Sequence, residues 1–278
     1  MRFIAYAILL SSLLPPPGAH AQAPARITLT YADLADLALL APIAAQVRIR
    51  DAIALKAAQA VGVPPGRTRF YVEADILSLI RGTADLAPRI HYLVDVPNGS
   101  DGSIRLQHKA EYLLLAAPGG RADPAEVRLL TSDAQVPWTP DLGNRVRALL
   151  KEAAVPGAAP PVMGVASAFY VPGTLPGESE TQLFLLTDKG KPVSLNVLRR
   201  PAQTPRWAVA LGEIVDEAAA PPAPDSLLWY RLACGLPRTI PPASLAEADP
   251  QSAAAIRADY ALVLDRLGPC ERHRIASR

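Results

Sequence analysis

Short segments in which apolar and polar residues alternate fill the first half of the chain. From Ile43 to Arg50 every second side chain is polar over most of the run, which predicts a strand with one face toward water. Four further segments have the composition of strands: Thr68–Ile80, Arg89–Val96, Ile104–Ala116 and Glu126–Thr131. The loop Pro97–Gly102 predicts a hairpin between the Arg89 and Ile104 segments. Five successive antiparallel strands predict a barrel-like unit, with an OB-like barrel as the candidate form, because closure removes exposed edges.

A second β region follows a linker. The run Pro156–Pro161 is the best candidate for a domain boundary. The apolar segment Val162–Val171 comes next, and an antiparallel meander is expected at Thr181–Thr187, Pro192–Arg199 and Arg206–Ile214. We therefore expect a mainly β chain with an α+β part. Its divisions are a leader (1–21), a β-rich barrel-like domain (22–135), a helix with a Pro/Ala linker (136–161) and an α+β domain (162–278).

Four helices are predicted from caps and helical spacing. Thr30, with Asp33 three residues later, has the pattern of a capping box before a short helix that ends at Pro42. Thr139 precedes a proline at the first helical position of a helix that extends to Ala154. Two C-terminal helices are expected, at Pro224–Cys234 and Asp249–Leu267, and the basic tail that follows is expected to fray.

The N-terminus has the three parts of a Sec-type signal peptide. Arg2 supplies the positive charge, Phe3–Leu14 is apolar, and Ala19–Ala21 carries small residues where a signal peptidase cleaves. The apolar stretch is shorter than the roughly 20 residues that span a bilayer, which argues against a membrane anchor. We expect cleavage after Ala21 and a protein of the periplasm or the medium, with no membrane span after cleavage.

Composition and charge narrow the classes of partner. Half of the residues are hydrophobic and 19% are charged, as in globular proteins. Loss of Arg2 with the leader leaves basic and acidic residues almost balanced, so no nucleic acid partner is expected. Phosphate-binding glycine loops and Cys-x-x-Cys or His-Glu-x-x-His motifs are absent, and no cofactor or metal is expected.

Cys234 and Cys270 are the only cysteines. Export places them where disulfides persist, so we expect a structural bridge that joins the C-terminal helices. A pair of free thiols and half of a metal site are the alternatives.

Catalytic candidates are few. Ser179 lacks the second glycine of a nucleophile elbow and precedes a strand, which favours a solvated loop. His91 and His108 fall on the arms of the predicted hairpin, where Glu111 or Asp95 would complete a metal site if all shared a face, but surface histidines are the favoured interpretation. Acidic pairs suited to acid–base chemistry occur in two clusters: Glu178 with Glu180, and Glu213 with Asp216 and Glu217.

The best binding hypothesis is a basic turn of the meander. Arg199, Arg200 and Arg206 surround this turn beside Trp207, and such a group suits an anionic ligand such as a phosphate, a carboxylate or a glycan acid. Protection of an edge strand by charge and proline is the alternative explanation.

Several phrases of the chain carry a resemblance to a known family. They are TYADLADLA, LVDVP, DAQVPWTP, GESETQLFL, PRWAVALGEIVDEAA and WYRLACGLP, and together they span nearly the whole mature chain. In these phrases the chain resembles exported proteins of sphingomonad-type alphaproteobacteria, a family with no assigned activity, so the resemblance implies no functional residue. We expect a non-catalytic envelope module that binds a partner protein or an anionic ligand; the alternative is an envelope hydrolase with a carboxylate-based site.

Overall fold

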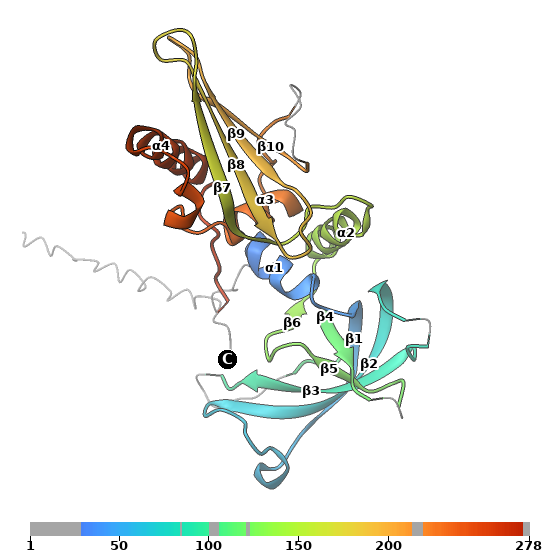
Figure 1. The fold of residues 1–278 in the computed structure, drawn as a ribbon. Coiled ribbons are helices and arrows are strands. Elements are labelled where there is room, and N and C mark those ends of the chain that lie inside the picture. Colours follow the sequence, from blue (N-terminus) through green and yellow to red (C-terminus); the bar gives the residue numbers. More distant parts are fainter. Residues whose placement is uncertain (1–28, 84, 100–105, 121–122, 213–218, 275–278) are drawn as a thin grey trace, which may run out of the picture.

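The fold is mainly β, with two antiparallel sheets and a group of helices (Figure 1). A computed structural model describes residues 29–83, 85–99, 106–120, 123–212 and 219–274. The expected signal peptide and its cleavage site lie outside these residues.

The first sheet is a nearly closed barrel. Its strands are β1 (Ile43–Ala54), β2 (Arg67–Arg81), β3 (Arg89–Pro97), β4 (Glu111–Pro118), β5 (Val127–Leu129) and β6 (Gln135–Pro137). They lie in the order β3-β2-β1-β4-β5, with β6 beside β4 and the short 3-10 turn η1 (Ala57–Gln59) between β1 and β2. An isolated parallel bridge between His91 of β3 and Glu126, directly before β5, nearly closes the barrel. The predicted barrel-like unit is confirmed.

The hairpin predicted at Pro97–Gly102 is wrong. β3 pairs with β2 along its whole length, from Arg67 opposite Pro97 to Asp75 opposite Arg89. β4 crosses instead to β1, where Ile49 donates its N–H to the carbonyl oxygen of Ala110 at 2.9 Å. Turn residues indicate that the chain reverses but do not say which strand it meets next. Part of the loop lies outside the described residues.

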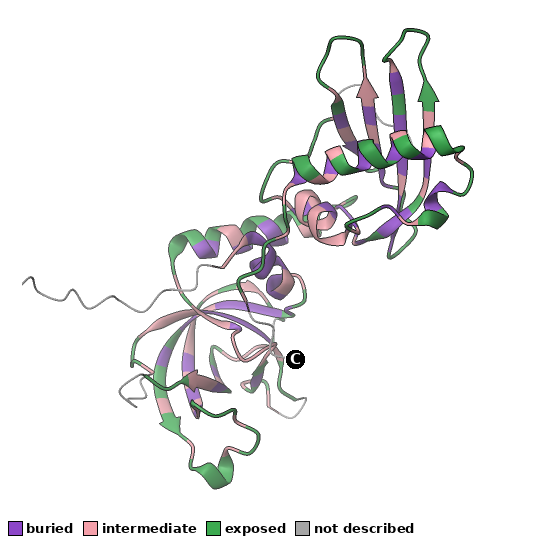
Figure 2. Cartoon of the chain, turned by 90° about the vertical axis from the view of Figure 1, so that its left-hand side faces the viewer, coloured by how far each residue is buried: buried purple, intermediate pink, exposed green. Residues whose placement is uncertain are grey.

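The second sheet is a four-stranded meander. Its order is β10-β9-β8-β7, formed by β7 (Val162–Pro172), β8 (Ser179–Thr187), β9 (Ser194–Arg199) and β10 (Arg206–Ala210). One face is covered by α4 (Pro250–Leu267), with α3 (Leu227–Gly235) and the 3-10 turn η2 (Pro242–Leu245) beside it (Figure 2). Inward side chains such as Leu183, Leu195 and Ile256 are fully buried there.

Helices join the barrel to the second sheet. α1 (Tyr31–Ala38) and α2 (Pro140–Ala154) pack with α3 in a third apolar cluster, which includes Leu34, Leu149 and Leu227 (Figure 1). The predicted N-caps are confirmed, since the hydroxyl of Thr139 accepts from the Leu142 N–H and Thr30 forms a full capping box. The predicted division into domains stays a prediction.

The C-terminal segment is fastened at both ends, and the expectation that it frays is wrong for residues 271–274. Cys234 and Cys270 form the expected disulfide, with 5.1 Å between their Cα atoms. Beyond it the backbone N–H groups of His273 and Arg274 donate to the Asp33 carboxylate at 3.0 and 3.1 Å. A disulfide fits an extracellular or periplasmic protein. The acids that hold the tail lie far away in sequence, so local composition does not reveal them.

Asp33 is fully buried, and its carboxylate is held by hydrogen bonds. Burial by itself raises the pKa of this carboxyl, but the N–H groups of His273, Thr30 and Arg274 outweigh it, and the pKa lies below its ordinary value. A carboxyl with a lowered folded-state pKa stabilises the fold above its unfolded value, about 3.9, and this contribution is lost as the pH falls through the folded-state value.

We therefore predict that the free energy of unfolding decreases as the pH is lowered from about 4, and that Asp33→Asn reduces this dependence. Urea unfolding at a series of pH values measures it. Asp265→Asn, at an exposed position of α4, is the control and is expected to follow the wild type. Equal pH dependence in Asp33→Asn and wild type would contradict the role of Asp33.

Candidate functional site

The basic turn predicted as a binding site is not assembled into one surface. The Arg199 guanidinium contacts the carboxylate of Asp259 on α4 at 2.6 Å, and the Thr181 hydroxyl donates to the same carboxylate at 2.5 Å. Asp259 is only 1% exposed, so this pair ties β8 and β9 to the helix that covers them. The positive charge of Arg199 is thus paired with a buried carboxylate of the same chain.

The other three residues of the turn point in different directions. Trp207 lies opposite Val197 and is buried in the core, whereas its neighbour Arg206 lies opposite Leu198 and is exposed. Successive side chains of a strand point to opposite faces, which separates the tryptophan from this cation. Arg200 is exposed just beyond β9. Binding of an anion at the turn stays a prediction, but Trp207 contributes to a different site.

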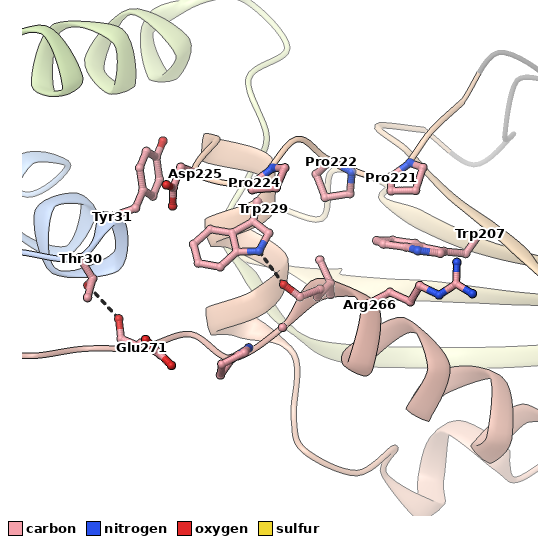
Figure 3. A pocket seen from close by; sticks show the side chains of 13 residues that line it. Thr30, Tyr31, Trp207, Pro221, Pro222, Pro224, Asp225, Trp229, Arg266 and Glu271 are labelled. Atoms are coloured by element: carbon pink, nitrogen blue, oxygen red, sulfur yellow. Dashed lines mark hydrogen bonds between the residues drawn. The ribbon is translucent and has the colours of Figure 1, made fainter.

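A pocket of about 360 Å³ lies where the two ends of the described chain meet (Figure 3). We call it the junction pocket. It is formed by the start of α1, by β10, by the segment before α3, by the end of α4 and by the residues after α4; its lining is Thr30, Tyr31, Trp207, Pro221, Pro222, Pro224, Asp225, Trp229, Arg266, Leu267, Gly268, Pro269 and Glu271. This volume lies in the range of small-ligand sites, roughly 300–1,000 Å³.

The walls of the junction pocket are flat and rigid. Tyr31 and Trp229 meet edge to face with 6.1 Å between ring centroids. The indole N–H of Trp229 donates to the Leu267 carbonyl oxygen at 2.8 Å, which fixes the orientation of the ring. Four prolines and Trp207 add further ring surfaces. These rings offer broad apolar contact at a small cost in conformational entropy.

Charged groups stand around the aromatic walls. Figure 3 shows Arg266 extending toward Trp207, while Asp225 and Glu271 lie near Tyr31 and Thr30. All three charged side chains are exposed, and none forms an ion pair with another described residue. Within the described residues, the pocket therefore offers one cation and two carboxylates that have no ion-pair partner.

The hydroxyl of Tyr31 is buried behind the pocket wall. The residue is only 7% exposed, and the hydroxyl has no hydrogen-bond partner among the described residues. Burial, followed by the carboxylates of Glu152 and Asp225, raises the pKa of this hydroxyl well above its ordinary value. The group is therefore a neutral donor at every physiological pH, and buried phenols normally use this donor.

The catalytic candidates are not brought together. Ser179 is buried in β8 between Pro172 and Arg199. Glu178 accepts from the Leu175 N–H within its own turn, and Glu180 accepts from the Asn196 side chain. The second acidic cluster (Glu213, Asp216 and Glu217) lies outside the described residues.

The histidine pair is also separated, because β3 and β4 are not neighbours. His91 lies 3.5 Å from the Asp123 carboxylate, whereas His108 is exposed in a turn. Asp95 pairs with Arg69 and Glu111 with Arg48, each at 2.7 Å. Among the residues that the structure describes, no three His, Cys, Asp or Glu side chains are placed to hold a metal ion.

The chain matches no protein-family model, and no curated protein is similar to it. None of the helices in the described ranges is long and apolar enough to cross a membrane. Sequence reasoning placed Trp207 in a binding site but did not identify the junction pocket as a whole. The run Pro221–Asp225, directly before the helix that carries Trp229, is a local feature of its lining.

The Arg199–Asp259 pair yields a stability prediction. Arg199→Ala leaves a buried carboxylate without its cation and should reduce the free energy of unfolding by about 3 kcal/mol. Arg206→Ala, on the exposed side of the neighbouring strand, should change it by less than about 0.5 kcal/mol. Chemical denaturation of both variants measures the difference. Similar losses in the two variants would show that the buried pair is not what distinguishes them.

Proposed function

We propose that the protein is an exported, non-catalytic binding module of the bacterial envelope whose ligand enters the junction pocket. The observation that carries the proposal is that residues from both ends of the described chain, Thr30 and Tyr31 from one and Arg266 and Glu271 from the other, line a single pocket. The walls of this pocket come from segments far apart in the sequence. Ligand sites often lie at such places, where separate parts of a fold meet.

The chemistry of the lining favours an acidic saccharide. The ring surfaces of Trp229 and of the lining prolines suit the flat apolar face of a sugar, and Arg266 supplies a charge-assisted donor for a carboxylate. Asp225 and Glu271 accept hydrogen bonds from hydroxyl or amide groups at the opposite end. An acidic saccharide is an anionic ligand, as was expected from the sequence. The cation proposed to bind it is Arg266, whereas the sequence pointed to Arg199.

Export by the N-terminal leader is part of the proposal. The pattern Arg2, Phe3–Leu14 and Ala19–Ala21 supports cleavage after Ala21, and the Cys234–Cys270 disulfide supports an oxidising compartment. Membership in the sphingomonad-type family of exported proteins stays a prediction.

We predict that cell fractionation finds the mature chain, starting at Gln22, in the periplasm or the medium. Intact-mass measurement reads the N-terminus directly. A cytoplasmic protein that retains Met1 would overturn the export proposal and leave the pocket chemistry unaffected.

A hydrolase that uses Asp225 and Glu271 is the second candidate, because these two carboxylates share the junction pocket. Both side chains are exposed, whereas a general acid at neutral pH usually works from a buried apolar site. Incubation with a chromogenic glycoside distinguishes the two candidates, since a binding module releases no product.

Binding is tested by the intrinsic tryptophan fluorescence, to which Trp207 and Trp229 contribute, during titration with glucuronic acid or N-acetylmuramic acid. We predict saturable quenching in the wild type and at least about a tenfold loss of affinity in Arg266→Ala, because a hydrogen bond to a charged group is lost. N-acetylglucosamine, which has no carboxylate, should bind wild type and Arg266→Ala alike.

The matched control is Arg257→Ala, an exposed arginine of the same helix outside the pocket lining, which should bind like the wild type. Equal binding of glucuronic acid by Arg266→Ala and wild type would sink the saccharide proposal. Binding of a proline-containing peptide in place of the sugars would reassign the pocket to a protein partner.

A further inference from the structure

The segment Gly268–Arg274, which we call the strap, is both a wall of the junction pocket and a tie between the two sheets. Gly268, Pro269 and Glu271 line the pocket. The carbonyl oxygen of Glu271 accepts from the Thr30 hydroxyl at 2.8 Å, across the pocket from α4 (Figure 3). Any movement of the strap therefore changes the shape of the pocket.

The distal end of the strap is held by groups of α1 and the barrel. In addition to the two backbone bonds to Asp33, Arg272 contacts the carboxylate of Asp36 at 2.6 Å and Arg274 contacts that of Asp133 at 2.7 Å. The Arg272 side chain is 43% exposed, and exposed ion pairs contribute only about 0–1 kcal/mol. The contacts of the last strap residues are less exposed: the Arg274 side chain is 10% exposed, and Asp33 is fully buried.

The strap is held covalently near its start, by the disulfide. Cys270 is bonded to Cys234 at the end of α3, whereas Gly268, just before it, has a φ of 74° that favours glycine. Without the bond, the strap is held by its noncovalent contacts alone, and rotation at Gly268 lets it swing away from the pocket whenever they break. With the bond, the strap stays beside α1, and the same contacts act at a high effective concentration.

The two sulfurs of the disulfide have different surroundings. Both cysteine residues are partly exposed. A guanidinium nitrogen of Arg272 donates to the Cys270 sulfur at 3.0 Å. A positive charge at one sulfur stabilises that sulfur as the departing thiolate, which directs an attacking thiolate to the other one, Cys234.

We infer that the Cys234–Cys270 bond is a redox latch for the strap: a dithiol reductant opens it, the strap detaches from α1, and the junction pocket loses one wall. The reaction is a two-step exchange. One thiolate of the dithiol bonds to the Cys234 sulfur and expels Cys270 as a thiolate. The second thiolate of the reductant then displaces Cys234, so that two electrons pass from the dithiol, which leaves as its own disulfide.

The link to ligand binding rests on the proposed function, but the movement of the strap is measurable without a ligand. We expect that reduction of the full mature chain with dithiothreitol speeds hydrogen exchange of the His273 and Arg274 amides by at least about tenfold, since their bonds to Asp33 are lost. Acrylamide quenching of tryptophan fluorescence should increase at the same time. Exchange in the barrel core, at Val47 and Val72, should stay unchanged.

The variant Cys234→Ala/Cys270→Ala should show the reduced behaviour without any reductant and should not respond to it. Arg238→Gln, an exposed arginine between α3 and η2, is a matched control that should keep the wild-type response. Unchanged exchange of the strap amides after complete reduction, with the barrel core intact, would overturn the latch.

The direction of attack has its own test. A brief reaction with glutathione followed by alkylation should leave glutathione on Cys234 and the alkyl group on Cys270. Peptide mass mapping measures this pattern, and the reverse pattern would overturn the role given to Arg272.

Titration with glucuronic acid in both redox states separates the two proposals. If reduction opens the strap but the protein binds no sugar, the latch is supported and the proposed ligand is wrong. If the strap does not move and both redox states bind the sugar equally, the ligand is supported and the latch is wrong.

Discussion

The carboxylate of Asp33 is the group on which the arrangement of the two sheets depends. It completes the capping box of α1 through the Thr30 N–H, and it also accepts the backbone N–H groups of His273 and Arg274. A buried carboxylate without such donors is strongly destabilising, so neither the helix start nor the C-terminal segment is independent of the other. The first described residues and the last ones are thereby held around one anion.

This closure explains why the junction pocket exists. Its lining comes from segments that the sequence separates by more than two hundred residues, and only the return of the chain to α1 brings Thr30 and Glu271 within hydrogen-bond distance. The apolar cluster of α1, α2 and α3 supplies the support beneath it. The pocket consequently forms only when the two ends of the described chain are packed together. A change that loosens the strap alters the shape of the pocket without changing its aromatic walls.

Local chemistry was sufficient to predict much of the fold. The Thr30 and Thr139 caps, the meander after Val162 and the disulfide each follow from residues close in sequence or from pairing of the only two cysteines. The wrong predictions concern distant partners. Glycine and asparagine at Pro97–Gly102 indicate a turn, but the choice of β1 as the neighbour of β4 depends on backbone hydrogen bonds across some sixty residues. The docked tail and the junction pocket arise in the same way.

Trp207 shows how tertiary contacts change the surroundings of a predicted binding residue. The sequence places this tryptophan beside three arginines, but strand alternation turns Arg206 away, and Asp259 pairs with Arg199. The cation that extends toward Trp207 is Arg266, which is on a helix sixty residues later (Figure 3). A cation is free for a ligand only when the fold leaves it without a carboxylate, and that condition depends on tertiary contacts. Unpaired charge around a rigid aromatic wall is therefore a stronger indication of a binding site here than the density of arginine along the chain.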